Sequence, residues 1–204
     1  MSLSANDEFR LGNFMATGFD RQRLIALLQR DALRTGTFTL ASGRTSHYYV
    51  DGRTVTLSAE GASVIAAGVL AALDQYPEVQ AVGGLTMGAD PIVGATLAAA
   101  GLAGRVNLRG FLVRKEAKGH GTGKLVEGPL TPGTTVAILD DVATTGGSSL
   151  QAVAAVEAIG CKVACVIVVL DRLEGAIAAF AEKGLALRSL VTIRDLGVEP
   201  LPPL

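Results

Sequence analysis

Two adjacent carboxylates followed by a turn rich in threonine, glycine and serine are the strongest chemical signal in this sequence. Asp140 and Asp141 follow the apolar run Val136–Leu139, and a segment with helical character comes after the turn. The turn consists of Thr144, Thr145, Gly146, Gly147 and Ser148. Its backbone N–H groups and hydroxyls, together with the helix N-terminus, can bind a phosphate. The carboxylates suit hydroxyl groups or a hydrated divalent cation. The combination predicts a site for a phosphorylated sugar.

A basic, glycine-rich segment is the second chemical signal. It begins where the apolar run 106–113 ends, and its potential cations are Arg114, Lys115, Lys118 and His120. Residues 114–133 show no apolar period, and loops of this length in compact domains usually have a function or are disordered. We expect a mobile catalytic loop that closes over a highly charged leaving group and neutralises its developing charge.

Apolar runs that alternate with helical segments must position these groups. We expect strands at about 79–82, 106–113, 135–139, 163–170 and 187–193, and helices at about 58–73, 91–100, 148–159 and 175–183. Continuous apolar strands that alternate with helices favour a parallel α/β sheet, which binds ligands at the carboxyl ends of its strands. Before this region, a helix is expected from Asp20 to about Arg34, stopped by Gly36, with a hairpin of residues 38–40 and 47–50 behind it.

Composition limits the class of protein. The chain has 204 residues, 49% hydrophobic and 18% charged, with a net charge of -1. That length predicts a single domain over residues 1–204, and the charge argues against nucleic acid or an anionic membrane as a partner. No apolar run is long enough to span a membrane. Cys161 and Cys165 would be too far apart on a strand for a disulfide, and no signal-peptide pattern opens the chain, so we expect a cytoplasmic protein.

Several motifs resemble one enzyme family. The acid pair and its turn resemble the signature for phosphoribosyl pyrophosphate (PRPP) in type I phosphoribosyltransferases. The run R-K-E-A-K-G-H-G at 114–121 closely resembles the catalytic loop of the orotate phosphoribosyltransferase family. Residues 38–51 resemble that family's F-T-L-x-S-G-x-x-S segment, and 170–174 its strand-end D-R-x-E. Residues 83–91 lie where the family has its pyrophosphate-binding loop.

This resemblance implies a Rossmann-like parallel sheet flanked by helices, with a small N-terminal hood formed by about 20–55 and the C-terminal end. It implies transfer of the phosphoribosyl group of PRPP to orotate, giving orotidine 5′-monophosphate and pyrophosphate. It also implies Mg²⁺, held mainly by PRPP with no direct protein ligand, and a homodimer that shares the mobile loop across its interface.

The same resemblance assigns roles to single residues. The turn at Thr144–Ser148 would hold the 5′-phosphate. Asp140 and Asp141 would orient the ribose hydroxyls and the surroundings of Mg²⁺. The basic loop would bind pyrophosphate, with Lys118 or His120 as the proton donor. Arg172, the backbone near Leu40–Ala41 and Tyr49 would select orotate. The residues implied for the loop are Arg114, Lys115, Lys118 and His120.

This chain departs from the family pattern at Ala41, Met87 and Gly88, where many members have a lysine and a Tyr-Lys pair. Three alternatives stay open at this point. One is a type I phosphoribosyltransferase for a purine or uracil, and another is a regulator that binds PRPP without catalysis. The third is a doubly wound domain without this activity.

Overall fold

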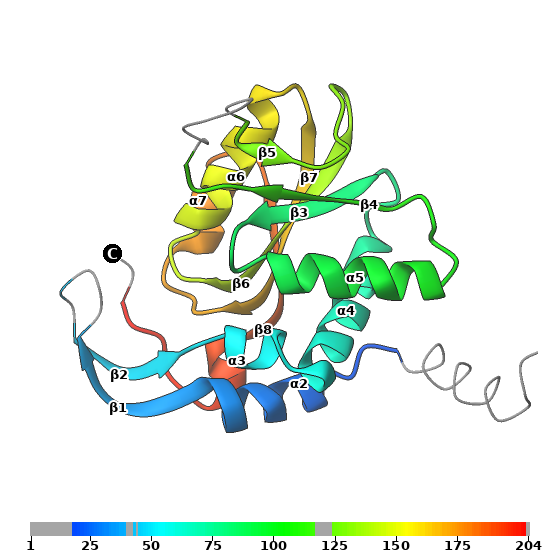
Figure 1. The fold of residues 1–204 in the computed structure, drawn as a ribbon. Coiled ribbons are helices and arrows are strands. Elements are labelled where there is room, and N and C mark those ends of the chain that lie inside the picture. The colour runs from blue at the N-terminus through cyan, green and yellow to red at the C-terminus, as the bar shows by residue number, and fades with distance from the viewer. Residues whose placement is uncertain (1–17, 40–42, 44, 117–123, 203–204) are drawn as a thin grey trace, which may run out of the picture.

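A six-stranded sheet forms the centre of this computed structural model, which describes residues 18–39, 43, 45–116 and 124–202 (Figure 1). The strand order is β5-β4-β3-β6-β7-β8. The strands are β3 (Ala81–Leu85), β4 (Arg109–Val113), β5 (Val126–Glu127), β6 (Thr135–Ala143), β7 (Lys162–Asp171) and β8 (Ala186–Thr192). All the pairs are parallel except that of the short edge strand β5 with β4. The predicted parallel α/β sheet is confirmed.

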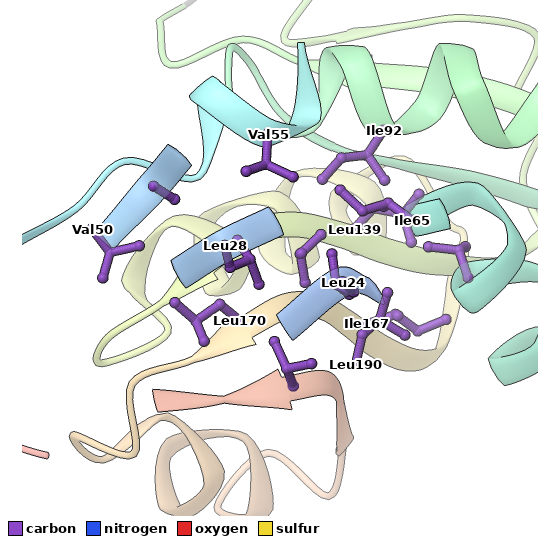
Figure 2. Packing of buried hydrophobic residues seen from close by; sticks show 14 of the residues in the cluster. Leu24, Leu28, Val50, Val55, Ile65, Ile92, Leu139, Ile167, Leu170 and Leu190 are labelled. Carbon is purple, nitrogen blue, oxygen red and sulfur yellow. The ribbon is translucent and has the colours of Figure 1, made fainter. Parts of the chain in front are cut away.

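Helices cover both faces of this sheet. One apolar cluster contains residues of α2 (Arg21–Leu27), α4 (Ala59–Leu73) and α5 (Asp90–Leu102), and a second contains residues of α6 (Gly147–Ala158) and α7 (Ala176–Ala181). Within β6, Leu139 belongs to the first cluster and Ile138 to the second. Figure 2 shows part of the first cluster, where Leu24 of α2 and Leu139 come together. Because neighbouring strand residues point to opposite faces, a strand covered on both must be apolar throughout.

A two-stranded hairpin lies beside this core. β1 (Leu33–Thr39) and β2 (Thr45–Val50) pair antiparallel, so the predicted hairpin is confirmed. The short helix α3 (Arg53–Thr56), which was not predicted, follows β2. Buried Val50 of β2 and Val55 of α3 join the same apolar cluster as α2, and this packing fixes the hairpin on the sheet.

The predicted end of the first helix was wrong. Its start is as expected, because Oδ1 of Asp20 accepts the N–H of Arg23 at 2.9 Å. However, α2 passes into a π-helical turn at Leu28–Ala32, and the chain is already extended at Leu33. Gly36 lies inside β1 with φ +152°, near a shift in the strand register, and does not stop a helix. Pairing with β2 and burial of the π-helical turn outweigh the local helical pattern, as tertiary contacts often do.

Two other boundaries affect the site. β6 continues to Ala143, so Asp140 and Asp141 lie within the strand and not after its end. The strand continues because β7 pairs with it that far, with Ala143 opposite Asp171. Residues 114–133 are not a loop throughout, because β5 pairs with β4. Residues 117–123 of that segment lie outside the described residues.

The C-terminal part of the chain returns to the hairpin side of the molecule (Figure 1). After β8 comes a 3-10 turn, Ile193–Leu196, and the backbone oxygen of Leu196 accepts the side-chain amide of Gln29 at 3.3 Å. Leu201 packs in the same cluster as Leu28. That these parts together form a hood over a bound base stays a prediction. No helix in the described part of the chain is long and apolar enough to cross a membrane.

Candidate active site

A cavity of about 310 Å³ opens between the hairpin side and the carboxyl ends of the central strands. Its walls come from the end of β2 and the segment after it, the end of β3 and the turn after it, the segment after β4, the last part of β6 and the start of α6. It is lined by Tyr49, Val50, Asp51, Gly52, Arg53, Leu85, Thr86, Met87, Gly88, Lys115, Asp140, Asp141, Val142 and Ser148. This is the edge where a parallel sheet is expected to bind ligands.

The structure brings five of the predicted site residues into this one cavity: Tyr49, Lys115, Asp140, Asp141 and Ser148. The other predicted phosphate-binding residues, Thr144–Gly147, do not belong to the lining; they lie between the end of β6 and Ser148. Gly146, at the N-cap of α6, has φ +83°, and a Cβ there would lie 2.9 Å from the Phe180 ring. Glycine is therefore required for the turn that points the N-terminus of a 12-residue helix at the cavity, where it favours an anion.

Asp140 is the buried member of the acid pair, only 4% exposed. Its Oδ2 accepts the hydroxyls of Ser148 at 2.6 Å and Ser149 at 2.7 Å, and its Oδ1 accepts the Asp141 N–H at 3.0 Å. Three donors therefore fix this carboxylate against the first turn of α6.

Asp141 has a different environment. Its Oδ1 accepts the N–H of Val142 at 2.9 Å, and no side-chain donor to its carboxylate occurs within the described residues. Burial, together with the charge of Asp140, raises the pKa of Asp141 to about 6. Asp141 is thus the carboxylate with free acceptor capacity, available to sugar hydroxyls or to a hydrated cation.

Two glycines lie against this pair. A Cβ on Gly88 would lie 2.8 Å from Oδ1 of both Asp140 and Asp141, and one on Gly52 would lie 3.1 Å from Oδ2 of Asp141. Contacts this short require a shift of neighbouring atoms, so residues with side chains do not fit here without moving the acids. Gly88 is one of the departures from the family pattern, and it is the one that lies against the acid pair. Met87, the other departure in this turn, is 65% exposed.

The start of the basic loop lies at the cavity. Lys115 lines it, and its backbone oxygen accepts the side-chain amide of Gln151 on α6 at 3.0 Å. Arg114 does not belong to the lining, and its Nε donates to Oε1 of Glu127 at 3.2 Å. Lys118 and His120, the predicted proton donors, lie outside the described residues, as does Ala41.

Arg172 lies in a buried cluster and not in the lining of this cavity. Its Nε contacts the hydroxyl of Tyr48 at 3.4 Å, and its guanidinium stacks over the Tyr48 ring at 4.9 Å. The Tyr48 hydroxyl donates to Oε1 of Glu174 at 2.8 Å. Nη2 of Arg172 also lies 2.8 Å from that oxygen, but outside hydrogen-bond geometry, so this buried nitrogen has no hydrogen bond in the described structure. The ring of the exposed Tyr49, next to Tyr48, lies beside the Phe38 ring, with 5.8 Å between the two ring centroids.

Sequence reasoning gave no role to several residues of the site. Asp51 and Arg53 line the cavity and pair with each other, with Nε 2.9 Å from Oδ1, which keeps the pKa of Asp51 below its ordinary value. Their spacing around Gly52 was a visible but weak signal. Ser149 and Glu174 are both 1% exposed, and only the folded structure reveals their partners.

The acid pair can contribute to a cation site only with other ligands. In the described part of the chain, no three His, Cys, Asp or Glu side chains gather into a group that could hold a metal ion. Two carboxylates beside a phosphate-binding turn nevertheless fit Mg²⁺, which often keeps waters and takes oxygens from the substrate phosphates.

Comparison with known proteins gives a consistent answer, although no family model matches the chain. The chain is 50% identical over 186 residues to the orotate phosphoribosyltransferase of Rhodopirellula baltica, covering 89% of this chain and 96% of that one. It is also 50% identical over 177 residues to that of Thermosynechococcus vestitus, covering 86% and 92%.

Solved structures agree. Mycobacterium tuberculosis orotate phosphoribosyltransferase in complex with PRPP matches with a TM-score of 0.74 and 36% identity, over 87% of this chain and 99% of that one. The adenine phosphoribosyltransferase of Leishmania tarentolae shares the fold at 15% identity and a TM-score of 0.59. The fold is thus that of the type I phosphoribosyltransferases. Within this class, the chain belongs to the orotate phosphoribosyltransferase family.

Proposed function

We propose that this protein transfers the phosphoribosyl group of PRPP to orotate, giving orotidine 5′-monophosphate and pyrophosphate, a step in pyrimidine biosynthesis. The observation that carries this proposal is the cavity in which the acid pair, the N-terminus of α6 and Lys115 meet. It provides groups for a sugar, a phosphate and a second anion side by side. Orotate is inferred as the second substrate because the chain belongs to the orotate phosphoribosyltransferase family.

PRPP would occupy this cavity from one end to the other. The turn at Thr144–Ser148 binds the 5′-phosphate through N–H groups and hydroxyls, and Asp141 with Asp140 accepts from the ribose hydroxyls. Lys115 lies where the pyrophosphate would extend toward the basic loop, whose other cations complete its site. Mg²⁺ would be held mainly by PRPP, with the acid pair nearby, and supplies charge neutralisation to the leaving pyrophosphate.

The reaction needs no protein nucleophile. The bond between the ribose C1 and the pyrophosphate oxygen breaks, and its electron pair leaves with pyrophosphate. The N1 lone pair of orotate then forms the new bond to C1, and the N1 proton passes to water. Departure that runs ahead of attack makes C1 cationic, so the protein acts by positioning and by stabilising charge. Lys118 or His120 would donate a proton to the departing group.

Orotate would be selected by Arg172 and Tyr49. Nη2 of Arg172 makes no hydrogen bond although it lies 2.8 Å from Oε1 of Glu174, so it is a donor that a flat anionic carboxylate could take, and a planar guanidinium suits that partner. Because Arg172 is only 7% exposed, we expect the hairpin around Tyr48 to shift when orotate binds.

We further propose a cytoplasmic homodimer whose basic loop reaches the neighbour's site. Both cysteines are free and buried, as in a reducing compartment. If the loop is shared, an inactive Lys118→Ala variant mixed with an inactive Asp141→Asn variant recovers part of the activity. If each site uses its own loop, the mixture stays inactive.

The first test is the fall in orotate absorbance after PRPP and Mg²⁺ are added, with adenine, hypoxanthine and uracil in parallel. We expect orotate to be consumed only when PRPP and Mg²⁺ are both present. Turnover of another base in place of orotate would show that the assigned base is wrong, but the assignment of the sugar-phosphate site would still hold. If no base reacts but PRPP raises the melting temperature, the protein is a PRPP-binding regulator.

A further inference from the structure

Two consecutive serines donate to one carboxylate oxygen at the start of α6. The hydroxyls of Ser148 and Ser149 lie 2.6 Å and 2.7 Å from Oδ2 of Asp140. This joins the phosphate-binding turn directly to the acid pair that faces the sugar. The contacts span the short turn between β6 and α6, so they hold the first turn of the helix against the end of the strand.

The two serines differ in what else they can reach. Ser148 is exposed and lines the cavity, whereas Ser149 is 1% exposed and does not belong to the lining. A hydroxyl has one proton, so Ser148 can donate to Asp140 or to a bound phosphate but not to both. The buried hydroxyl of Ser149 does not line the cavity, so it continues to donate to Asp140 when a phosphate binds.

We propose that Ser149 is a positioning residue for the sugar-phosphate site, which keeps Asp140 in place when the substrate's 5′-phosphate takes the hydroxyl of Ser148. The proposal rests on the function proposed above and deepens it. Without Ser149, a buried carboxylate close to a phosphate would lose both hydroxyl donors at the moment of binding. Leaving a buried acceptor poorly satisfied is costly, so Asp140 would turn away.

This arrangement also divides the work of the acid pair. Asp140 is held by three donors and anchors the turn, and Asp141 keeps its acceptors for the substrate. The N–H of Asp141 donates to Oδ1 of Asp140 at 3.0 Å, so a rotation of Asp140 also disturbs Asp141. Loss of the Ser149 hydroxyl should therefore weaken the binding of PRPP more than the binding of phosphate alone.

The experiment measures binding to the full chain by calorimetry with Mg²⁺ and without orotate. The variants are Ser149→Ala, Asp140→Asn, the double variant and Ser148→Ala. Ser63→Ala is the control, because Ser63 donates only to a backbone oxygen within α4, Ala59 O at 2.8 Å. The probes are PRPP and inorganic phosphate.

We expect Ser149→Ala to raise the Kd for PRPP about two- to tenfold, the range for one hydrogen bond, and to raise the Kd for inorganic phosphate by a smaller factor. Ser148→Ala should weaken both, and Ser63→Ala neither. In the Asp140→Asn background, Ser149→Ala should add less than about a twofold effect, because Ser149 acts through Asp140. In steady-state kinetics, the KM for PRPP should rise and that for orotate should stay.

Three results would overturn this inference. The first is wild-type affinity for PRPP in Ser149→Ala, and the second is a double variant whose defects multiply. The third is an equal loss for phosphate and PRPP, which indicates a purely structural role. If Ser149→Ala does not fold, Ser149→Cys, with a weaker donor of similar size, takes its place in the cycle. A wild-type protein that does not bind PRPP would refute the proposed function itself.

Discussion

Substitution of Gly88 by alanine should abolish most of the activity while the fold persists. The new Cβ would lie 2.8 Å from Oδ1 of both Asp140 and Asp141. An ordinary contact begins at 3.4 Å, so about 0.6 Å must be made up by movement of the acids or of the turn. Asp140 cannot rotate freely, because it accepts hydrogen bonds from Ser148 and Ser149.

The size of the effect follows from this shift. A misplacement of about 1 Å in a catalytic constellation can cost about 100-fold, so we expect kcat/KM for PRPP to fall about 10- to 100-fold. Overpacking of one methyl group should lower the free energy of unfolding by about 1–3 kcal/mol, which leaves the protein folded. The assay is orotate consumption at varied PRPP, beside thermal unfolding of the same samples.

Gly94→Ala is the matched control. Gly94 lies in α5, and a Cβ there would meet nothing within 4 Å. Alanine should therefore keep the activity and add about 0.5–1 kcal/mol of stability from its better helix propensity. Wild-type kcat/KM in Gly88→Ala would refute the reasoning, because the acid pair would then tolerate a neighbour that the structure has no room for.

Further substitutions test other parts of the site. Asp141→Asn should abolish turnover yet stabilise the fold. In the folded protein the pKa of Asp141 is raised from 3.8 to about 6, so the folded state binds this proton more tightly than the unfolded chain does. The free energy of unfolding of the wild-type protein therefore falls as pH rises from about 4 to 6. Unfolding curves at pH 4 and pH 7 should show that this fall is smaller in the variant, and an unchanged pH dependence would contradict it. Lys118→Ala should raise the barrier by about 3–4 kcal/mol, measured as kcat, with the melting temperature unchanged; an unaltered kcat would remove Lys118 from the mechanism. Glu174→Ala should cost about 3–5 kcal/mol of unfolding free energy, because it leaves Arg172 buried without its partner. Glu174→Gln should retain more stability, and equal losses in both would show that packing, not charge, matters.

The order and type of the main elements could be predicted because their signals are local. The start of α4 is one example: Ser58 accepts the N–H of Gly61 at 3.0 Å and caps the helix at the predicted residue. The middle parts of β6 and β7 are continuous apolar runs, as expected for strands that are covered on both faces. The same local pattern failed at Leu33, because pairing with Val50, a strand partner farther along the chain, outweighs helical periodicity.

For this protein, the sequence by itself determined the chemistry available. Each motif is contiguous in the sequence: the acid pair, the phosphate-binding turn and the basic loop. These motifs and their order along the chain were sufficient to indicate the family. Only the tertiary structure decided which groups share a cavity and which are paired elsewhere. Tyr48 and Glu174, which share a hydrogen bond, are 126 residues apart. Such contacts depend on strand register and helix packing, because distant residues meet only where the buried core brings their elements together.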